Sequence, residues 1–248
     1  MSTGKIIVAG IGPGSESDIT PAVLSAIRQS DVIVGYKYYF QFVESAIRPD
    51  AICIDSGMKR EKVRAEEAYN YASEGHVVTV ISSGDSGIYG MAPLIYEMKR
   101  EKGSDISIEV LPGISAFQKA ASLLGAPVGH DFCVISLSDR LTPWEVIEKR
   151  LACAAMGDFC VALYNPSSKG RPDYLQKAVR ILLQNGKGAG TLCGVIRSIG
   201  RTGQQSSQMT LAELEHTTVD MFTTVFIGNS ATHQVSGWMV TPRGYHGV

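Results

Sequence analysis

Short apolar runs alternate with amphipathic stretches along the first half of the chain. Each apolar run is followed, after a polar or glycine-rich junction, by a stretch whose apolar positions recur at helical spacing. Thr20 followed by Pro21 predicts the start of one helix, and Gly75 and Gly103 predict the ends of two others. This alternation is typical of a largely parallel sheet covered by helices, so we expect an α/β fold. The runs that predict strands are 5–10, 31–35, 51–55, 76–84 and 106–113.

The pattern pauses near residues 125–131, where the stretch GAPVGHD places two glycines and a proline between periodic segments. We expect a domain boundary at this loop, with an N-terminal α/β domain over 1–128 and a C-terminal α/β domain over 129–248. The second half restarts with strand and helix patterns. Its last apolar runs have little helix between them, which predicts antiparallel pairing and therefore a mixed sheet in the second domain.

Composition excludes several classes of function. The formal net charge of −1 gives no reason to expect a nucleic acid or an anionic membrane as partner. No apolar run approaches the length of a membrane-spanning helix, about 20 residues. The five cysteines form no CxxC pair and mostly sit in apolar runs, so we expect reduced, buried thiols and a cytoplasmic protein. The five histidines show no ligand spacing, and we expect no metal site.

The glycine-rich stretch GIGPG at 10–14 follows the first predicted strand, where a dinucleotide-binding protein carries its phosphate loop. Here the spacing is GxGxG, and Pro13 removes an N–H donor that a phosphate would need. The next helix is predicted to begin only near Pro21, so the loop does not run into a helix N-terminus. Tyr36 and Lys37 stand after the second strand, where a ribose-binding carboxylate is expected. The pattern therefore argues against NAD.

Four further predicted strands end in glycine-rich or polar segments. Parallel sheets bind ligands outside the carboxyl ends of their strands, and small residues there let a ligand touch the backbone. Together with GIGPG, these ends indicate one extended cleft near the domain interface. The segments are SSGDSGIYGM at 82–91, LPGISAF at 111–117, LYNPSSKGR at 163–171 and VIRSIGRTGQ at 195–204.

The order GIGPG, SGDSGIYG, PGIS, YNPSSKGR and VIRSIGR, spread over nearly the whole chain, resembles that of the tetrapyrrole methylases. The resemblance implies two α/β domains with the active site in the cleft between them, usually as a homodimer. It also implies methyl transfer from S-adenosylmethionine to a porphyrin-like ring in cobalamin biosynthesis. The sequence looks most like the branch that methylates carbon 17 of precorrin-3B or cobalt-precorrin-3 with ring contraction.

The resemblance also implies which residues touch each ligand. Asp85 is the candidate catalytic base, although a structural or ligand-orienting role for it stays open. Many relatives have proline where this chain has Ser86, and we expect the serine to loosen the turn slightly. Residues expected to contact S-adenosylmethionine, or its product S-adenosylhomocysteine, are Gly84, Asp85, Ile88, Ser115, Ala116, Leu163, Tyr164, Asn165, Val195 and Thr224. Residues expected to contact the tetrapyrrole and its carboxylates are Gly12, Pro13, Gly14, Lys169, Arg171, Arg197 and Arg201.

Two further clusters have a structural and a functional interpretation. The aromatic stretch YKYYF at 36–40 fits core or dimer packing, or else a surface on which a ring stacks. The basic run that contains Lys59, Arg60, Lys62 and Arg64 begins a predicted helix and is interpreted as a solvated helix face. Three alternatives to the C(17) activity remain: a sister methylase acting at another ring carbon, an NAD-dependent oxidoreductase, and a tetrapyrrole carrier without catalysis.

Overall fold

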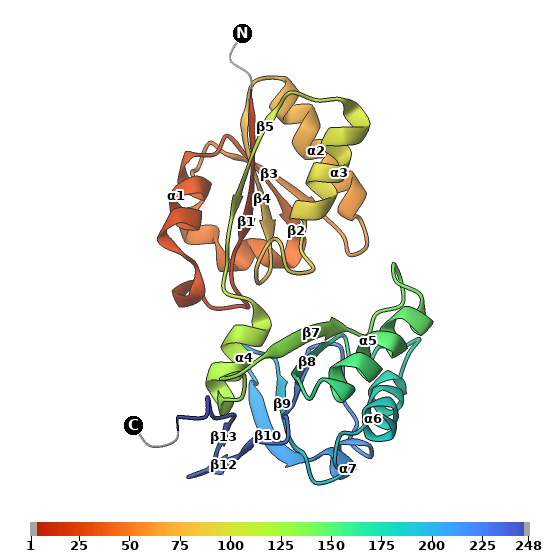
Figure 1. Cartoon of the computed structure of the whole chain (residues 1–248). Helices are drawn as coiled ribbons and strands as arrows, with labels where there is room; N and C mark the ends of the chain where they lie inside the picture. The colour runs from red at the N-terminus through yellow and green to blue at the C-terminus, as the bar shows by residue number, and fades with distance from the viewer. Residues whose placement is uncertain (1–3, 246–248) are drawn as a thin grey trace. The chain divides into compact units, whose positions relative to one another are not determined.

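The computed structural model of the chain describes residues 4–245. These fall into two compact units, Met1–Ala116 and Phe117–Val248, which Figure 1 colours from red to yellow-green and from green to blue. Each unit is an α/β structure built around its own five-stranded sheet. No helix among the described residues is long and apolar enough to cross a membrane.

The first unit holds a fully parallel sheet with the strand order β3-β2-β4-β1-β5. Helix α1 covers one face, and helices α2 and α3 cover the other (Figure 1). The strands are β1 (Lys5–Gly10), β2 (Val32–Tyr36), β3 (Ile52–Ser56), β4 (Val77–Ser82) and β5 (Ser107–Leu111). The helices are α1 (Pro21–Gln29), α2 (Glu61–Ser73) and α3 (Ala92–Lys102), with short 3-10 turns η1 (Glu16–Asp18), η2 (Lys37–Phe42) and η3 (Glu44–Ala46).

Strand β1 shows why this sheet is buried on both faces. Its side chains alternate, so that Ile6 and Val8 join the core under α2 and α3. Ala9, on the other face, joins the core under α1 with Ile27 and Ile33. Continuous apolar runs are typical of central parallel strands, and the sequence signal at 5–10 is of this kind.

The second unit holds a mixed sheet with the strand order β10-β9-β11-β8-β7, in which only β7 and β8 pair in parallel. Helices α5, α6 and α7 pack on one face around a single core (Figure 1). The strands are β7 (Phe132–Ser136), β8 (Cys160–Tyr164), β9 (Leu192–Arg197), β10 (Gln205–Thr210) and β11 (Thr223–Ile227). The helices are α4 (Ala116–Leu124), α5 (Trp144–Met156), α6 (Tyr174–Gln184) and α7 (Leu211–Leu214). A small sheet joins β6 (Gly125–Ala126), β12 (His233–Val235) and β13 (Trp238–Val240).

The division between the units falls before α4, earlier than the loop at 125–131 that the sequence pattern indicated. Helix α4 packs on the second sheet, because the side chain of Leu124 occupies the space where Gly194 of β9 has no Cβ. The chain then enters β6, which pairs with β13 of the same unit. The glycines and the proline after α4 therefore mark a turn inside the second unit.

Candidate functional site

The carboxyl ends of all five parallel strands of the first unit meet at one edge of its sheet, and three glycine-rich loops follow β1, β4 and β5 there. Two of these loops pair directly. The Gly12 N–H donates to the Gly84 carbonyl at 3.1 Å, and the Gly84 N–H donates to the Gly12 carbonyl at 2.7 Å. The loop after β1 is thus bound to the loop after β4 through its backbone groups. In a phosphate-binding loop, these groups would point toward the ligand.

The third loop is packed against the first two so closely that only glycine fits. A Cβ on Gly113 would collide with the carbonyl oxygens of Gly84 and Gly10, and one on Gly10 would lie 2.7 Å from the Gly113 nitrogen. Gly12 and Gly84 also have φ angles of +72° and +69°, which other residues rarely adopt. The glycines of GIGPG therefore allow loops to interlock. Helix α1 begins only at Pro21, beyond η1, as the sequence analysis expected.

The Asp85 carboxylate joins the loops after β4 and β5. Its Oδ1 accepts hydrogen bonds from the N–H groups of Gly87 at 2.8 Å and Ile88 at 3.0 Å. Its Oδ2 accepts one from the N–H of Gly113 at 3.1 Å. Three backbone donors converging on one carboxylate fix its orientation. These contacts are those of a residue that positions two loops.

Ser86 holds the same region together. It is fully buried, and its hydroxyl lies 3.2 Å from the carbonyl oxygens of both Val8 and Leu111, on β1 and β5. Its own carbonyl accepts the N–H of Ala92 at the start of α3. The single hydroxyl proton, donated to one of these carbonyls or shared between them, ties the turn to the sheet.

The structure brings several of the residues predicted for the cofactor close together within the first unit. A Cβ built on Gly84 would lie 3.7 Å from the Ala116 nitrogen and 3.8 Å from the Ser115 Cα, so the space between these backbones would just hold one methyl group. Ser115 is buried, whereas Ile88 is 40 % exposed. The backbone of Gly84, Ser115 and Ala116 thus forms one surface beside the Asp85 loop.

In the second unit, the predicted residues at the end of β8 organise neighbouring segments. The Tyr164 hydroxyl oxygen accepts a hydrogen bond from the Phe117 N–H at 2.8 Å, which satisfies a donor in the first turn of α4. Asn165 adopts φ of +54°, and its side-chain amide donates to the Ser136 hydroxyl at 2.9 Å. Both side chains therefore hold the segment that follows β8 in place.

The remaining predicted cofactor residues of this unit differ in where their side chains point. Leu163 and Val195 belong to the core under α5, α6 and α7. Thr224 pairs with Ile196, whereas Val195 pairs with Val225, so the side chains of Thr224 and Val195 lie on opposite faces of the sheet. A ligand would reach Leu163 and Val195 only through their backbone.

The cations predicted to meet substrate carboxylates divide into two groups. Arg171 forms an ion pair with Asp139, and Arg197 pairs with Asp220, Nε to Oδ2, at 2.7 Å. Lys169, by contrast, lies at the tip of the tight turn between Ser168 and Arg171 and forms no ion pair with a described residue. Two of the predicted arginines thus have partners within the protein, and Lys169 keeps its charge available.

Asp139 lies at the centre of the Arg171 cluster. The Tyr174 hydroxyl donates to Asp139 Oδ2 at 2.6 Å. This hydrogen bond lowers the pKa of Asp139 against the opposing effect of burial, and the charge of Arg171 adds to the lowering. The same hydrogen bond raises the pKa of Tyr174. The cluster fixes the base of the loop that carries Lys169.

Arg64 is buried, although the basic run that contains it predicted a solvated helix face. Arg64 is 6 % exposed; its Nε donates to the Ser56 hydroxyl at 2.7 Å and its Nη2 to the Gly57 carbonyl at 2.8 Å. The buried positions of α2 recur at the spacing of one helix face, and Arg64 is the first of them. That periodicity is the signal that could have separated it from its neighbours. The buried positions are Arg64, Ala65, Ala68, Tyr69 and Ala72.

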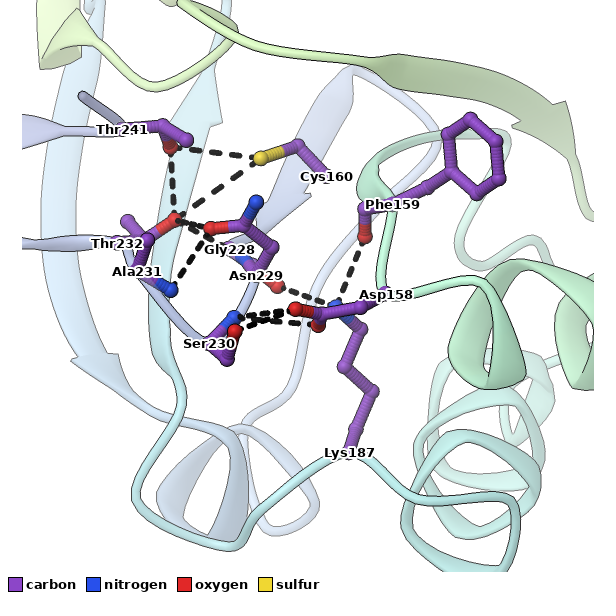
Figure 2. A network of polar contacts seen from close by, with 10 residues as sticks. All are labelled: Asp158, Phe159, Cys160, Lys187, Gly228, Asn229, Ser230, Ala231, Thr232 and Thr241. Carbon is purple, nitrogen blue, oxygen red and sulfur yellow. Dashed lines mark hydrogen bonds and ion pairs between the residues drawn. The ribbon is translucent and has the colours of Figure 1, made fainter. Parts of the chain in front are cut away.

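A second missed cluster surrounds Lys187 at the amino end of β8, the end away from Tyr164 (Figure 2). The Lys187 ammonium donates at 2.9 Å to Asp158 Oδ1 and to the carbonyls of Phe159 and Gly228. Ser230 donates to the same Asp158 carboxylate through its N–H and its hydroxyl. The buried ammonium has three acceptors, as a lysine in a protein interior requires, so its role is structural.

The cysteines are only partly buried, which corrects the expectation that burial is general. Cys160 and Cys193 are buried, but Cys53 and Cys153 are exposed. Burial raises the pKa of the Cys193 thiol to about 12. This thiol is protonated at neutral pH and is a poor nucleophile.

Comparison with known proteins bears on this arrangement of loops. The family model described as Tetrapyrrole (Corrin/Porphyrin) Methylases matches residues 5–215. A cobalt-factor III methyltransferase of Priestia megaterium is 47 % identical over 98 % of this chain, which spans 45 % of that protein's length. A probable cobalt-factor III C(17)-methyltransferase of Salmonella typhimurium is 45 % identical over 96 % of this chain and 98 % of its own. The crystal structure of the methyltransferase CobJ matches with a TM-score of 0.89 and 40 % identity, covering 96 % of this chain and 100 % of the other.

These similarities extend over both units and every loop described above. The chain belongs to the tetrapyrrole (corrin/porphyrin) methylases. Its fold is the fold of that family, as the resemblance implied.

Proposed function

We propose that this chain is an S-adenosylmethionine-dependent methyltransferase that methylates carbon 17 of a precorrin-3B or cobalt-factor III type ring, with ring contraction, in cobalamin biosynthesis. The observation that carries the proposal is the 45 % identity to a probable cobalt-factor III C(17)-methyltransferase of nearly the same length. The structure supports it, because motif residues of the first unit hydrogen-bond its loops together, and within the second unit Tyr164 binds the first turn of α4. The Priestia relative is about twice as long, so any activity of its additional part is not included in the proposal.

For the cofactor, we propose that the backbone of Gly84, Ser115 and Ala116 lines the adenosylmethionine site, with Ile88 beside it. Backbone groups suit this ligand, because its purine and its amino-acid zwitterion can be bound by hydrogen-bond donors and acceptors. No charged protein side chain is needed for them. In the second unit, Tyr164, Asn165 and Thr224 keep their proposed contacts. Leu163 and Val195 would contribute only carbonyl or N–H groups.

Methyl transfer requires mainly that the protein hold the cofactor methyl group and the ring carbon in the right positions. The ring carbon supplies the electron pair for the new carbon–carbon bond, and the pair of the broken S–CH3 bond stays on sulfur, which gives S-adenosylhomocysteine. Holding the two reactants in line supplies much of the acceleration in such a reaction. In this proposal Asp85 is not a base. It keeps the loops that bind the cofactor at a fixed separation.

For the substrate, we propose that Gly12, Pro13 and Gly14 form the side of the site against which the ring lies. Lys169 keeps its proposed role as a partner for a ring carboxylate, and Arg201 remains a candidate. Arg171 and Arg197 are reassigned to loop positioning, because each already pairs with an aspartate of its own unit. A homodimer and a cytoplasmic location also remain proposals, testable by light scattering and by fractionation of cells.

A calorimetric titration with S-adenosylhomocysteine, with NAD run in parallel, tests the cofactor. Micromolar or tighter binding of S-adenosylhomocysteine without binding of NAD is expected. NAD binding alone would overturn the proposal. A sister activity at another ring carbon is the alternative within the family, and it is distinguished by locating the new methyl group on the product.

A further inference from the structure

We propose that the loop between β3 and α2, with Lys59 and Arg60, and the first turn of α2, with Lys62, bind peripheral carboxylates of the tetrapyrrole substrate. The inference rests on the proposed function for its ligand class, but it assigns a set of residues that the motifs do not include. We name these three residues the β3 loop cations.

The position of the loop is fixed by the parallel sheet. β3 ends at Ser56, so the residues after it leave from the same edge as the loops that hold Gly12, Asp85 and Gly113. In the order β3-β2-β4-β1-β5, the β3 loop is two strands away from the Asp85 loop. At about 4.8 Å per strand, that is a separation of about 10 Å. A macrocycle placed over the glycine-rich loops would extend its side chains in this direction.

The charges at this edge are unevenly distributed. The loop after β1 carries Glu16 and Asp18, and the loop after β4 carries Asp85. Cations gather instead after β2 and β3, at Lys37 and at the β3 loop cations. One end of the edge is therefore suited to anionic groups, and the glycine-rich part is not.

The β3 loop cations point to no carboxylate partner among residues 4–245, the part of the chain that the structure describes. All three are exposed, and none forms an ion pair with a described residue. Carboxylates of the neighbouring segments include Glu61, whose Oε1 lies 3.8 Å from Arg64 Nη1, the exposed Asp55 at the end of β3, and Glu66, one helical turn after Lys62. Arg171 and Arg197, two of the three arginines that the motifs suggested, pair with aspartates. The β3 loop cations thus add charge that substrate carboxylates can reach, beside Lys169.

The segment after β3 is also held in a defined backbone conformation. A charged surface without a specific ligand would not need such a conformation. The buried Arg64 donates hydrogen bonds to the Ser56 hydroxyl and the Gly57 carbonyl. Its guanidinium carbon lies 5.8 Å from the centre of the Tyr36 ring. Lys59 adopts φ of +66°, which turns the chain sharply before α2. The buried Arg64 therefore fixes the start of the segment from which the three charged side chains project.

The test uses uroporphyrin III, a tetrapyrrole polycarboxylate, as a fluorescent probe of binding to the full chain at low salt and at about 0.5 M salt. The variant combines Lys59→Asn, since asparagine tolerates a left-handed φ, with Arg60→Gln. The control combines Arg100→Gln with Lys102→Gln at the end of α3, which lies at the other edge of the same sheet. Both pairs remove one lysine and one arginine, so the net charge is matched.

The β3 loop variant is expected to bind uroporphyrin about five- to tenfold more weakly at low salt, the size typical of two exposed ion pairs. The difference should shrink at high salt, and the control should bind as the wild type does. S-adenosylhomocysteine affinity should be unchanged in both variants, which also shows that both are folded.

Equal weakening in the two variants, no weakening in either, or a wild type that does not bind the probe would overturn the inference. A fall in S-adenosylhomocysteine affinity in the β3 loop variant would do the same, because the loop would then support the cofactor site. A different outcome would contradict the proposed function and leave this inference intact. A wild type that binds uroporphyrin through this loop but does not methylate carbon 17 contradicts the C(17) assignment alone.

Discussion

The Asp85 carboxylate accepts a hydrogen bond from the backbone N–H of Gly113 at 3.1 Å and so joins the loops that follow β4 and β5. Its second oxygen holds the N–H groups of Gly87 and Ile88, which close its own loop. A third loop joins through the paired backbones of Gly12 and Gly84. The edge of the first sheet is therefore one interlocked assembly, and a change in one loop should affect the others.

Replacing Asp85 with asparagine should weaken binding of S-adenosylhomocysteine about tenfold, because the amide turns an N–H group toward the Gly113 N–H or gives up its other contacts. A hydrogen bond to a charged acceptor contributes about 1.5–3 kcal/mol, and tenfold corresponds to about 1.4 kcal/mol. Calorimetry gives the affinity, and circular dichroism checks the fold. If turnover is lost while affinity stays at the wild-type value, Asp85 acts as a base and the positioning account is wrong.

The variant Gly113→Ala should lower the free energy of unfolding by about 1–3 kcal/mol and abolish high-affinity binding of S-adenosylhomocysteine. The added Cβ collides with the carbonyl oxygens of Gly84 and Gly10, which are backbone atoms and must move together with their loops. Gly190→Ala is the control, because nothing lies within 4 Å of a Cβ at that position. Urea titration of both variants measures the difference, and equal stability would contradict the interlocked loops.

Tyr164→Phe should reduce S-adenosylhomocysteine affinity several-fold with little change in global stability. The phenol oxygen is lost as acceptor for the Phe117 N–H, so the first turn of α4, which begins with Ala116 and follows Ser115, is less firmly held. Steady-state kinetics should show the Michaelis constant for S-adenosylmethionine rising more than kcat falls. An unchanged Michaelis constant would remove Tyr164 from the cofactor site.

The contribution of Asp139 to stability should depend on pH. Its pKa is lowered in the folded chain, so the stability that it adds is fully present above its ordinary value of 3.8 and is lost as the pH falls below that value. Asp139→Asn should therefore be less stable than the wild type at neutral pH, and the two should converge in acid. Urea midpoints across the pH range test this, and a gap that is constant with pH would rule out the ionised Asp139 as its source.

Lys187→Met should destabilise the second unit by about 2–4 kcal/mol, because two carbonyls and the Asp158 carboxylate lose the ammonium as donor and Asp158 keeps only Ser230 (Figure 2). Lys149→Met, on the exposed side of α5, should change stability by less than about 0.5 kcal/mol. Denaturant titration of the pair measures both effects. S-adenosylhomocysteine affinity of the folded Lys187→Met variant should match the wild type, since the cluster lies at the other end of β8 from Tyr164.

Local patterns predicted most of the fold. The apolar runs of β1, β2 and β4 and the Thr20–Pro21 helix start lie where the sequence indicated, because burial on both faces and capping are properties of neighbouring residues. The compact units divide at the start of α4, earlier than the sequence pattern placed the boundary, and the packing of α4 on Gly194 depends on residues far apart in the chain.

In the candidate site, too, features that depend on neighbouring residues could be predicted, and contacts between distant segments could not. Glycine spacing and the motifs indicated which loops matter, and the sequence argument against a dinucleotide was based on Pro13 and the late start of α1. The partners of Arg171 and Arg197 could not be inferred, because Asp139 and Asp220 lie in other segments. Arg64 was inferable from the buried stripe of α2, but its charge led to a surface assignment.

The central claim is methyl transfer to carbon 17, and the most direct measurement follows a labelled methyl group. The protein is incubated with S-adenosylmethionine carrying a 13C-methyl group, and with cobalt-factor III and precorrin-3B in separate reactions, and the products are examined by NMR. The account predicts one labelled methyl on carbon 17 of a ring-contracted product from at least one substrate. A labelled methyl at another ring carbon, or no transfer to either ring by protein that binds S-adenosylhomocysteine, would contradict it.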